Sequence, residues 1–264
     1  MIETRTTDSQ SFGDHLRAWR QRRRLSQLDL ALDAEISARH LSFMETGRSR
    51  PSRDMVLRLA AELDVPLRDR NALLLAAGYA PAYADRPLDD AGLAVARDAI
   101  GTLLAAQEPF PALAVDRHWN LVIANAAGQR LMQGVAAHLL TPPINVLRLS
   151  LHPEGAAPRI ENLAEWKAHL LHRLHKQFEA SADPFLLDLI AELRGYPAPP
   201  LKERTEIALA VPLCIRSAKG PMSFLSTTLL FGAPRDVTLS ELAIEIFLPA
   251  DADTVARLRA QTPA

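Results

Sequence analysis

Arginine is the residue type whose placement in this chain most clearly suggests chemistry. Residues 12–58 contain ten arginines and no lysine, against six acidic residues. A guanidinium is planar and can bond two acceptors at once, which suits phosphate groups and base edges. The whole chain is nearly neutral, with 30 Lys and Arg against 31 Asp and Glu, so this excess is local. The same arginines could also form a solvated helical surface. Charge alone does not distinguish such a surface from one that recognises phosphates or base edges.

Residues that could bind a metal or act as nucleophiles form no recognisable arrangement. His169, His172 and His175 follow at intervals of three on a predicted helix, so the outer two diverge by about 120°. Zinc-binding helices prefer pairs spaced by four, and we therefore predict a polar helix face and no metal site. The single cysteine, Cys214, excludes a disulfide within one chain. No Gly-x-Ser-x-Gly or glycine-rich phosphate loop occurs, so we predict that the protein is not an enzyme.

Residues 25–52, LSQLDLALDAEISARHLSFMETGRSRPS, have the periodicity of two short helices joined by a tight turn. Ser26 and Ser37 are suitable N-caps for the first and the second helix. Apolar residues recur on the face that each helix would bury, namely Leu30, Ala31 and Ala34, then Ile36 in the turn, then Leu41 and Met44. The pattern predicts a helix-turn-helix, whose second helix can lie in a DNA major groove.

Residues 12–75 resemble the lambda-repressor-like (Cro/C1, XRE-type) family. The resemblance rests on Leu-Ser-Gln at 25–27, Leu-Ala at 30–31, Ile-Ser at 36–37, Glu-Thr-Gly-Arg at 45–48 and Pro51. It implies that Arg39 reads guanine from the recognition helix, because a guanidinium can bond O6 and N7 together. The other DNA contacts that it implies are Gln27, Ser37, Ala38, His40, Phe43, Arg48, Arg50 and Arg53.

The resemblance also implies two structural features of the DNA-binding domain. Glu45 matches a position whose carboxylate pairs with an arginine of the first helix, here Arg20. The turn usually has glycine at the position of Glu35, because the backbone there has a positive φ that strains other residues. We expect Glu35 to reduce stability without loss of the fold.

Length and composition predict two folded domains. A chain of 264 residues with 48% hydrophobic residues is long for one small helical domain. We expect residues 1–11 to be a flexible N-terminus, 12–80 the DNA-binding domain with further helices at 53–63 and 67–77, 81–108 a linker and connecting helix, and 109–264 a second domain. No signal-like or membrane-spanning apolar run occurs, so we expect a cytoplasmic protein without a membrane partner.

The second domain has the element order of a PAS-like domain. Two strands at 112–115 and 121–124 precede a helical middle and three antiparallel strands. The predicted helices are about 127–139, 161–178 and 184–194, the later strands 207–215, 224–231 and 244–248, and the last helix 251–261. The predicted fold class is therefore an all-α, five-helix lambda-repressor-like domain followed by an α+β PAS-like domain. In the latter, helices would pack on one face of a five-stranded antiparallel sheet and leave a cavity between the layers.

Nearly the whole chain is similar to the MmyB-like regulators. The similarity is carried by RNALLLAAGYAP (70–81), PALAVDRHWNLVIAN (111–125) and NVLRLSLHPEGAAPRI (145–160), following the helix-turn-helix. Members join a DNA-binding domain to a PAS-like ligand-binding domain, for which a fatty-acid-like ligand has been suggested. The resemblance implies no firm cofactor beyond such a ligand.

Candidate residues for a ligand cavity are mostly apolar. They are Val115, Leu121, Ile123, Leu147, Leu149, Leu151, Trp166, Leu170, Leu174, Leu209, Val211, Leu213 and Leu225, with Trp119, Asn125, Arg148 and His152 as polar or amphipathic groups. For a carboxylate ligand, Arg148 or His152 would be the partner. The alternative is that these side chains simply fill a core.

Three hypotheses for function follow. The first is a transcription regulator that binds double-stranded operator DNA as a homodimer and senses a small apolar ligand. The second keeps DNA binding and makes the C-terminal domain a ligand-free protein-interaction or dimerisation module. The third, an enzyme fused to an operator-binding domain, requires an open polar cleft that the sequence does not suggest.

Overall fold

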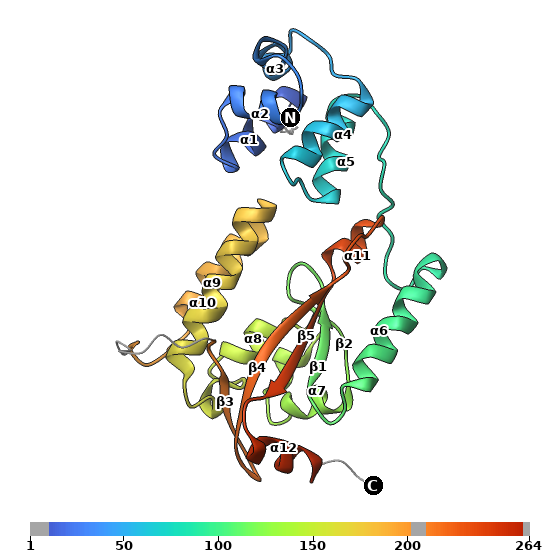
Figure 1. Cartoon of the computed structure of the whole chain (residues 1–264). Coiled ribbons are helices and arrows are strands. Elements are labelled where there is room, and N and C mark those ends of the chain that lie inside the picture. The colour runs from blue at the N-terminus through green and yellow to red at the C-terminus, as the bar shows by residue number, and fades with distance from the viewer. Residues whose placement is uncertain (1–10, 202–209, 261–264) are drawn as a thin grey trace, which may run out of the picture. The chain divides into compact units, whose positions relative to one another are not determined.

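The computed structural model describes residues 11–201 and 210–260. The chain forms two compact units, one of residues 1–85 with 234–240 and the other of residues 86–233 with 241–264 (Figure 1). Two predicted features, the flexible N-terminus over residues 1–10 and the cavity residue Leu209, lie outside the described residues. No helix within the described ranges is both long enough and apolar enough to cross a membrane.

The N-terminal unit contains the five helices that the sequence predicts. They are α1 (Phe12–Arg22), α2 (Gln27–Asp33), α3 (Ala38–Glu45), α4 (Arg53–Glu62) and α5 (Leu67–Ala76). Ser26 and Ser37 are the N-caps of α2 and α3, each accepting a hydrogen bond from a first-turn amide. Leu16, Leu30, Leu41 and Met44 are buried together with the apolar faces of α4 and α5. The helix-turn-helix prediction is confirmed.

The turn between α2 and α3 has the strained conformation expected of it. Glu35 adopts a φ of 53°, a region that disfavours side chains with a Cβ. The turn is still closed by the amide of Ile36, which donates to the Ala31 carbonyl at 2.9 Å. Glycine is required elsewhere, at Gly13, because a Cβ there would lie 2.4 Å from the Glu45 carbonyl oxygen. This close approach lets α1 pack directly on the end of α3.

The C-terminal unit is a five-stranded antiparallel sheet with helices, as predicted. Its strands are β1 (Ala112–Val115), β2 (Leu121–Ala124), β3 (Leu213–Ser217), β4 (Gly220–Leu230) and β5 (Ala243–Pro249), in the order β2-β1-β5-β4-β3. Its helices include α6 (Ala94–Ala106), α7 (Ala126–Leu131), α8 (Val146–Leu151), α9 (Leu163–Ser181), α10 (Pro184–Gly195) and α12 (Ala252–Arg259). Short 3-10 turns lie at Ala91–Leu93 (η1), Ala137–Leu140 (η2) and Ala157–Arg159 (η3).

Several element boundaries differ from the predictions. The expected helix over 127–139 is divided into α7 and η2, because Gly134 adopts a φ of 76° and interrupts it. The strand expected at 207–215 begins at Leu213 and continues to Ser217 in the described part of the chain. Two short helices, α8 and α11 (Val237–Glu241), were not predicted. Six- and five-residue helices carry little periodic signal.

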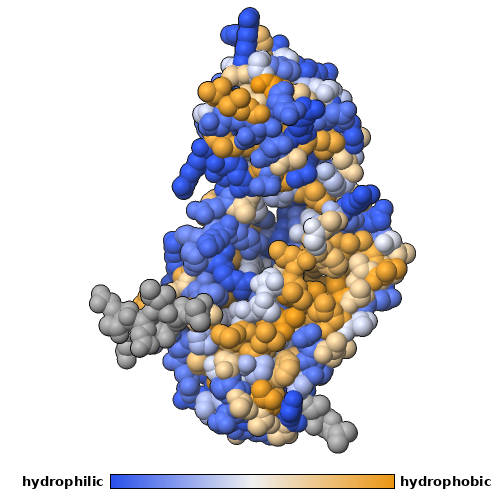
Figure 2. Space-filling model, viewed as in Figure 1, coloured by the Kyte–Doolittle hydropathy of each residue, from blue (hydrophilic) through white to orange (hydrophobic). Residues whose placement is uncertain are grey.

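The two faces of the sheet have different environments. Leu113, Phe224 and other inward residues join one hydrophobic cluster with α8, α9 and α10. On the other face, Leu225 lies opposite Leu248, and both side chains are about 40% exposed. Figure 2 shows hydrophobic residues gathered on one side of the C-terminal unit. The space between the sheet and these helices therefore lies on the inward face of the sheet.

Candidate DNA-binding helix and ligand cavity

Helix α3 and its N-cap carry five of the nine residues predicted to contact DNA. Arg39 is exposed, and its Cζ lies 5.2 Å from the ring centroid of Phe43. The Cζ of Arg48 lies 5.9 Å from the same ring. A guanidinium over an aromatic face is attracted to it while its N–H donors stay available. Ser37, Ala38 and His40 occupy the N-cap and first turn, and Arg53 is exposed at the start of α4. These DNA contacts stay predictions.

Behind this surface, α3 is fixed to α1 by a buried carboxylate. Glu45 accepts from Arg20 Nε at 2.6 Å and from Arg20 Nη2 at 2.9 Å. Its side chain is fully buried, and that of Arg20 is 11% exposed. Burial raises the pKa of Glu45, but hydrogen bonds from Arg20 and Gln27 and the charges of Arg20 and Arg17 outweigh it and leave the pKa below its usual range. The predicted Arg20–Glu45 pair is confirmed.

Two residues assigned to phosphate contacts also bond to groups of their own unit. The Gln27 amide nitrogen donates to Glu45 Oε2 at 2.7 Å. Arg50 donates to the Ala77 carbonyl through Nε at 3.2 Å and Nη2 at 3.1 Å, at the end of α5. These bonds stabilise the fold and leave other N–H groups of both side chains unused, so the assignment of Gln27 and Arg50 to phosphate contacts stays a prediction. Arg23 and Arg58 likewise donate to backbone carbonyls, so part of the arginine excess is structural.

The C-terminal unit contains an apolar cavity of about 90 Å³ between the sheet and the helices. Its lining is drawn from β1, the turn between β1 and β2, α7 to α9 with the segments that connect them, β3 and β5. Those residues are Leu113, Trp119, Gly128, Leu131, Met132, Val135, Val146, Leu147, Leu149, Ser150, Ala156, Ile160, Trp166, Leu170, Arg173, Leu213, Ile215, Glu245 and Phe247. Of the predicted lining residues, Trp119, Leu147, Leu149, Trp166, Leu170 and Leu213 are present. The structure therefore contains the predicted cavity, but one that is small compared with ligand pockets of about 300–1,000 Å³.

One ion pair supplies the charged groups of the cavity. Arg173 of α9 donates to both carboxylate oxygens of Glu245 on β5, at 3.0 and 2.7 Å. The Glu245 side chain is 3% exposed and also accepts from the Thr228 hydroxyl at 2.8 Å. The Cζ of Arg173 lies 4.8 Å from the ring centroid of Trp119. This pair holds α9 against the centre of the sheet and places a guanidinium at the cavity wall.

The residues predicted to supply the polar groups of the cavity, Asn125, Arg148 and His152, lie outside its lining. Arg148 does not line the cavity, because its guanidinium is paired with Glu192 at 2.7 Å. His152 lies beside Tyr196 and also outside the lining. Burial and then the neighbouring Glu192 raise the pKa of Tyr196 to about 12. Asn125 caps α7 and donates to the carbonyls of Leu104 and Phe110.

The other predicted lining residues among the described ones lie outside the cavity wall because of strand phase or depth. Ile123 and Leu225 are 40% and 39% exposed on the outer face of the sheet. Val115, Leu151 and Leu174 are buried in the hydrophobic cluster, with Leu121 and Val211 packed against it, but none contributes to the cavity wall. Arg173 and Glu245 were missed. A signal for Glu245 was available, since a lone acid within the apolar run AIEIFL predicts a buried partner.

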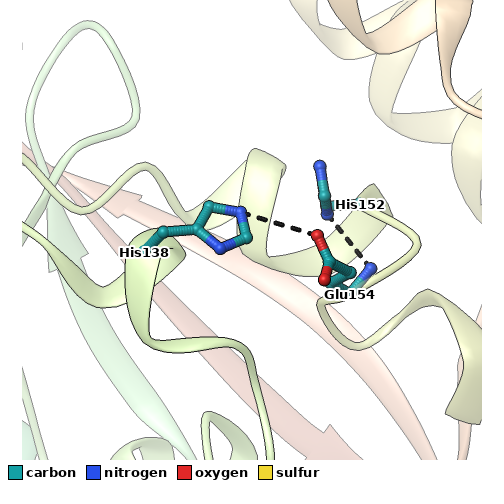
Figure 3. Close-up of side chains that lie close together, drawn as sticks. All are labelled: His138, His152 and Glu154. Atoms are coloured by element: carbon teal, nitrogen blue, oxygen red, sulfur yellow. Dashed lines mark hydrogen bonds and ion pairs between the residues drawn. The ribbon is translucent and has the colours of Figure 1, made fainter.

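His138, His152 and Glu154 form a separate cluster in the described part of the chain, with potential ligand atoms within 4.8 Å of one another (Figure 3). His138 Nε2 lies 3.9 Å from Glu154 Oε2. His152 Nδ1, however, already accepts the Glu154 backbone amide at 3.0 Å, so its lone pair is not directed at a shared centre. His169 lies outside this cluster and stacks on Trp166. Its burial and, to a smaller extent, the charge of Arg173 lower its pKa.

Comparison with known families decides the identity of both units. Residues 96–260 match the family described as the MmyB-like transcription regulator ligand binding domain. The chain belongs to the MmyB-like transcription regulators. Residues 11–73 match a helix-turn-helix domain. This MmyB-like protein is therefore a DNA-binding transcription regulator with a ligand-binding domain, and both of its matched families are regulatory.

Other comparisons add little to the MmyB-like assignment. No curated protein matches the chain. Among solved structures, it is similar to one described as an RNA-binding Light-Oxygen-Voltage Receptor, at 17% sequence identity and a TM-score of 0.28. The alignment covers 96% of this chain and 63% of the receptor chain, so the chain spans less than two thirds of that protein. At that TM-score we base no argument on the likeness.

Proposed function

We propose that this regulator binds operator DNA as a homodimer and senses a small, mainly apolar ligand in the C-terminal cavity. The observation that carries the sensing proposal is a cavity walled by both layers of the domain, apolar except for a few groups such as the Arg173–Glu245 pair. A ligand there contacts sheet and helices together. It can shift the protein between two states only if it binds one of them more tightly.

The size of the cavity constrains the proposed ligand. At about 90 Å³ it is smaller than an engineered cavity of about 150 Å³ that accepts benzene. A fatty-acid-like chain therefore requires side chains to move, and the partly buried Met132 and Val135 stand at the wall near the Gly134 break. We propose that an acyl chain enters by displacing this segment, with its polar end near Arg173. A ligand-free interaction module remains the second candidate, favoured by the small volume.

The outer face of the sheet supports a second copy of the chain as the partner. Ile123 pairs in register with Ala114, which lies opposite Ile244, and Ile244 lies opposite Leu229. Ala114 and Ile244 in the middle of this row are buried, whereas Ile123 and Leu229 at its ends are each 40% exposed. Leu225 and Leu248 on the same face are 39% and 41% exposed. Exposed apolar patches of this kind commonly mark protein interfaces. Dimerisation would also give operator binding the affinity that one half-site lacks.

Native mass spectrometry of the full chain tests both proposals. Incubation with decanoic acid is expected to add one ligand mass per chain to the folded protein, and denaturation should remove it. Ala156→Phe places a ring at the cavity wall and should abolish the adduct, whereas Leu187→Phe, at a position of α10 that is 45% exposed and outside the cavity lining, should keep it. A protein that binds no decanoic acid under these conditions would favour the interaction module. The same spectra report assembly, and a monomer at micromolar concentration would contradict the dimer.

DNA readout is tested at Arg39. An operator is first selected from random duplexes with the wild-type protein. Arg39→Ala should then weaken operator binding by about 1–3 kcal/mol per half-site and relax preference at one base pair. Arg53→Ala, at an exposed position assigned to phosphate, should weaken operator and random DNA alike and lower the salt slope. Equal losses on both DNAs for Arg39→Ala would refute its assignment to base readout.

A further inference from the structure

A second pocket of the C-terminal unit has an unusual concentration of positive charge. Its volume is about 410 Å³, and it lies between α7, η3, the β3–β4 hairpin and α12. Four of its lining side chains are cationic, namely Arg130, Arg159, Arg216 and Lys219. No acidic side chain lines it among the described residues. The pocket is distinct from the apolar cavity, although both share Leu131 and Ile215 as part of their walls.

The four cations are held in place largely without neutralisation. Arg130 lies 3.4 Å from Glu108, the one carboxylate paired with any of the four within the described chain. Arg159 donates to the Leu131 carbonyl at 2.9 Å, Arg216 to the Pro158 carbonyl at 2.8 Å, and Lys219 to the Ala260 carbonyl at 2.7 Å. Carbonyl oxygens orient a cation but do not cancel its charge. At least three positive charges therefore face one pocket.

Helix capping accounts for part of this arrangement only. Carbonyls at helix C-termini attract cations, and Arg159 and Lys219 lie at the ends of α7 and α12. That role uses one N–H of each side chain, whereas a guanidinium has five. Burial without a carboxylate partner also lowers the pKa of Arg159. Capping does not explain why Arg130 and Arg216 face the same space.

We propose that this pocket binds the phosphate group of a small phosphate monoester. A monoester dianion carries about two negative charges and three terminal oxygens, which matches several cations better than a single carboxylate does. Arginine forks suit such oxygens in bidentate geometry. The pocket volume falls within the range for small-molecule sites and leaves room for an organic group beyond the phosphate. This proposal is independent of the ligand in the apolar cavity.

Isothermal titration of the full chain in phosphate-free buffer tests the proposal. The probes are phenyl phosphate, inorganic phosphate and benzoate. We expect saturable binding of phenyl phosphate and weaker or comparable binding of inorganic phosphate, with benzoate much weaker. Arg216→Gln and Lys219→Gln, both at exposed positions, should each raise the Kd by about tenfold or more, as expected for loss of a charge-assisted hydrogen bond. Arg159→Gln should do the same, and the exposed pair keeps the test valid if that variant does not fold.

Arg97→Gln is the matched control. Arg97 is exposed on α6, donates to the Leu88 carbonyl at 3.4 Å, and lies outside the pocket. Arg97→Gln removes the same charge as the pocket variants, but at a site outside the pocket. The Kd for phenyl phosphate should therefore stay at the wild-type value. The proposal is overturned if neither phosphate compound binds saturably, if the pocket variants bind like Arg97→Gln, or if benzoate binds as tightly as phenyl phosphate.

Discussion

Replacing Glu45 with alanine will destabilise the N-terminal unit by about 3–5 kcal/mol, the range for breaking a buried ion pair from one side. The substitution leaves the Arg20 guanidinium, 11% exposed, without its carboxylate. It also removes the acceptor of the Gln27 amide and a charge 3.6 Å from Arg17. Because Glu45 joins α1 and α2 to the end of α3, we expect the loss to spread over all three helices.

Hydrogen exchange resolved by mass spectrometry measures this effect within one unit of a two-unit protein. Amides of α1 and α3 should exchange faster in Glu45→Ala, while the sheet of the C-terminal unit stays unchanged. Glu62→Ala is the control, because Glu62 is exposed on α4. A loss no larger than that of Glu62→Ala would show that the pair contributes nothing to stability.

The same carboxylate gives a defined pH dependence. Its pKa in the folded protein lies below the ordinary value of 4.5. A depressed pKa contributes stability above that ordinary value and loses it as the pH falls through the folded value. The wild-type unit should therefore lose more stability than Glu45→Ala when acidified from pH 5. Parallel acid curves for the two proteins would contradict the assignment.

The accuracy with which the sequence predicts a helix or strand depends on how many periodic residues that element contains. Helices α9 and α10 were placed within a few residues because their apolar residues recur over three turns or more. Helix α8 has six residues and no such repeat. Strand β3 was expected too early, because its alternating pattern extends upstream through residues that lie outside the described ranges. Local periodicity therefore identifies long elements, whereas short elements depend on tertiary contacts that the sequence pattern does not show.

Among the site residues, too, some follow from the local sequence and others are decided by strand register or by distant partners. Leu225 and Leu213 are both apolar strand residues, yet one faces solvent and the other the cavity, because pairing register decides the face. Arg148 was a reasonable anchor by position, but Glu192, distant in sequence, takes its guanidinium. Arg20–Glu45 could be predicted because the family resemblance supplied the pairing. Arg173–Glu245 could not, since no local pattern joins residues on α9 and β5.

Replacing Glu245 with alanine is the second change with a large expected effect. Glu245 lies on β5 between its neighbours β1 and β4, and its side chain is 3% exposed. The variant leaves Arg173 facing an apolar cavity and removes the acceptor of the Thr228 hydroxyl. We expect the C-terminal unit to lose about 3–5 kcal/mol, seen as faster hydrogen exchange in β4, β5 and α9. Glu161→Ala, at an exposed position in the same unit, should have almost no effect.

A double variant separates the stabilising role of the pair from a role in ligand binding. Arg173→Met with Glu245→Leu removes both charges and should recover most of the lost stability, because apolar residues often replace a buried pair without loss. If the polar end of the ligand contacts Arg173, the recovered protein should bind decanol as well as it binds decanoic acid, whereas the wild type prefers the acid. Retained preference for the acid in the folded double variant would show that the ion pair only joins α9 to the sheet.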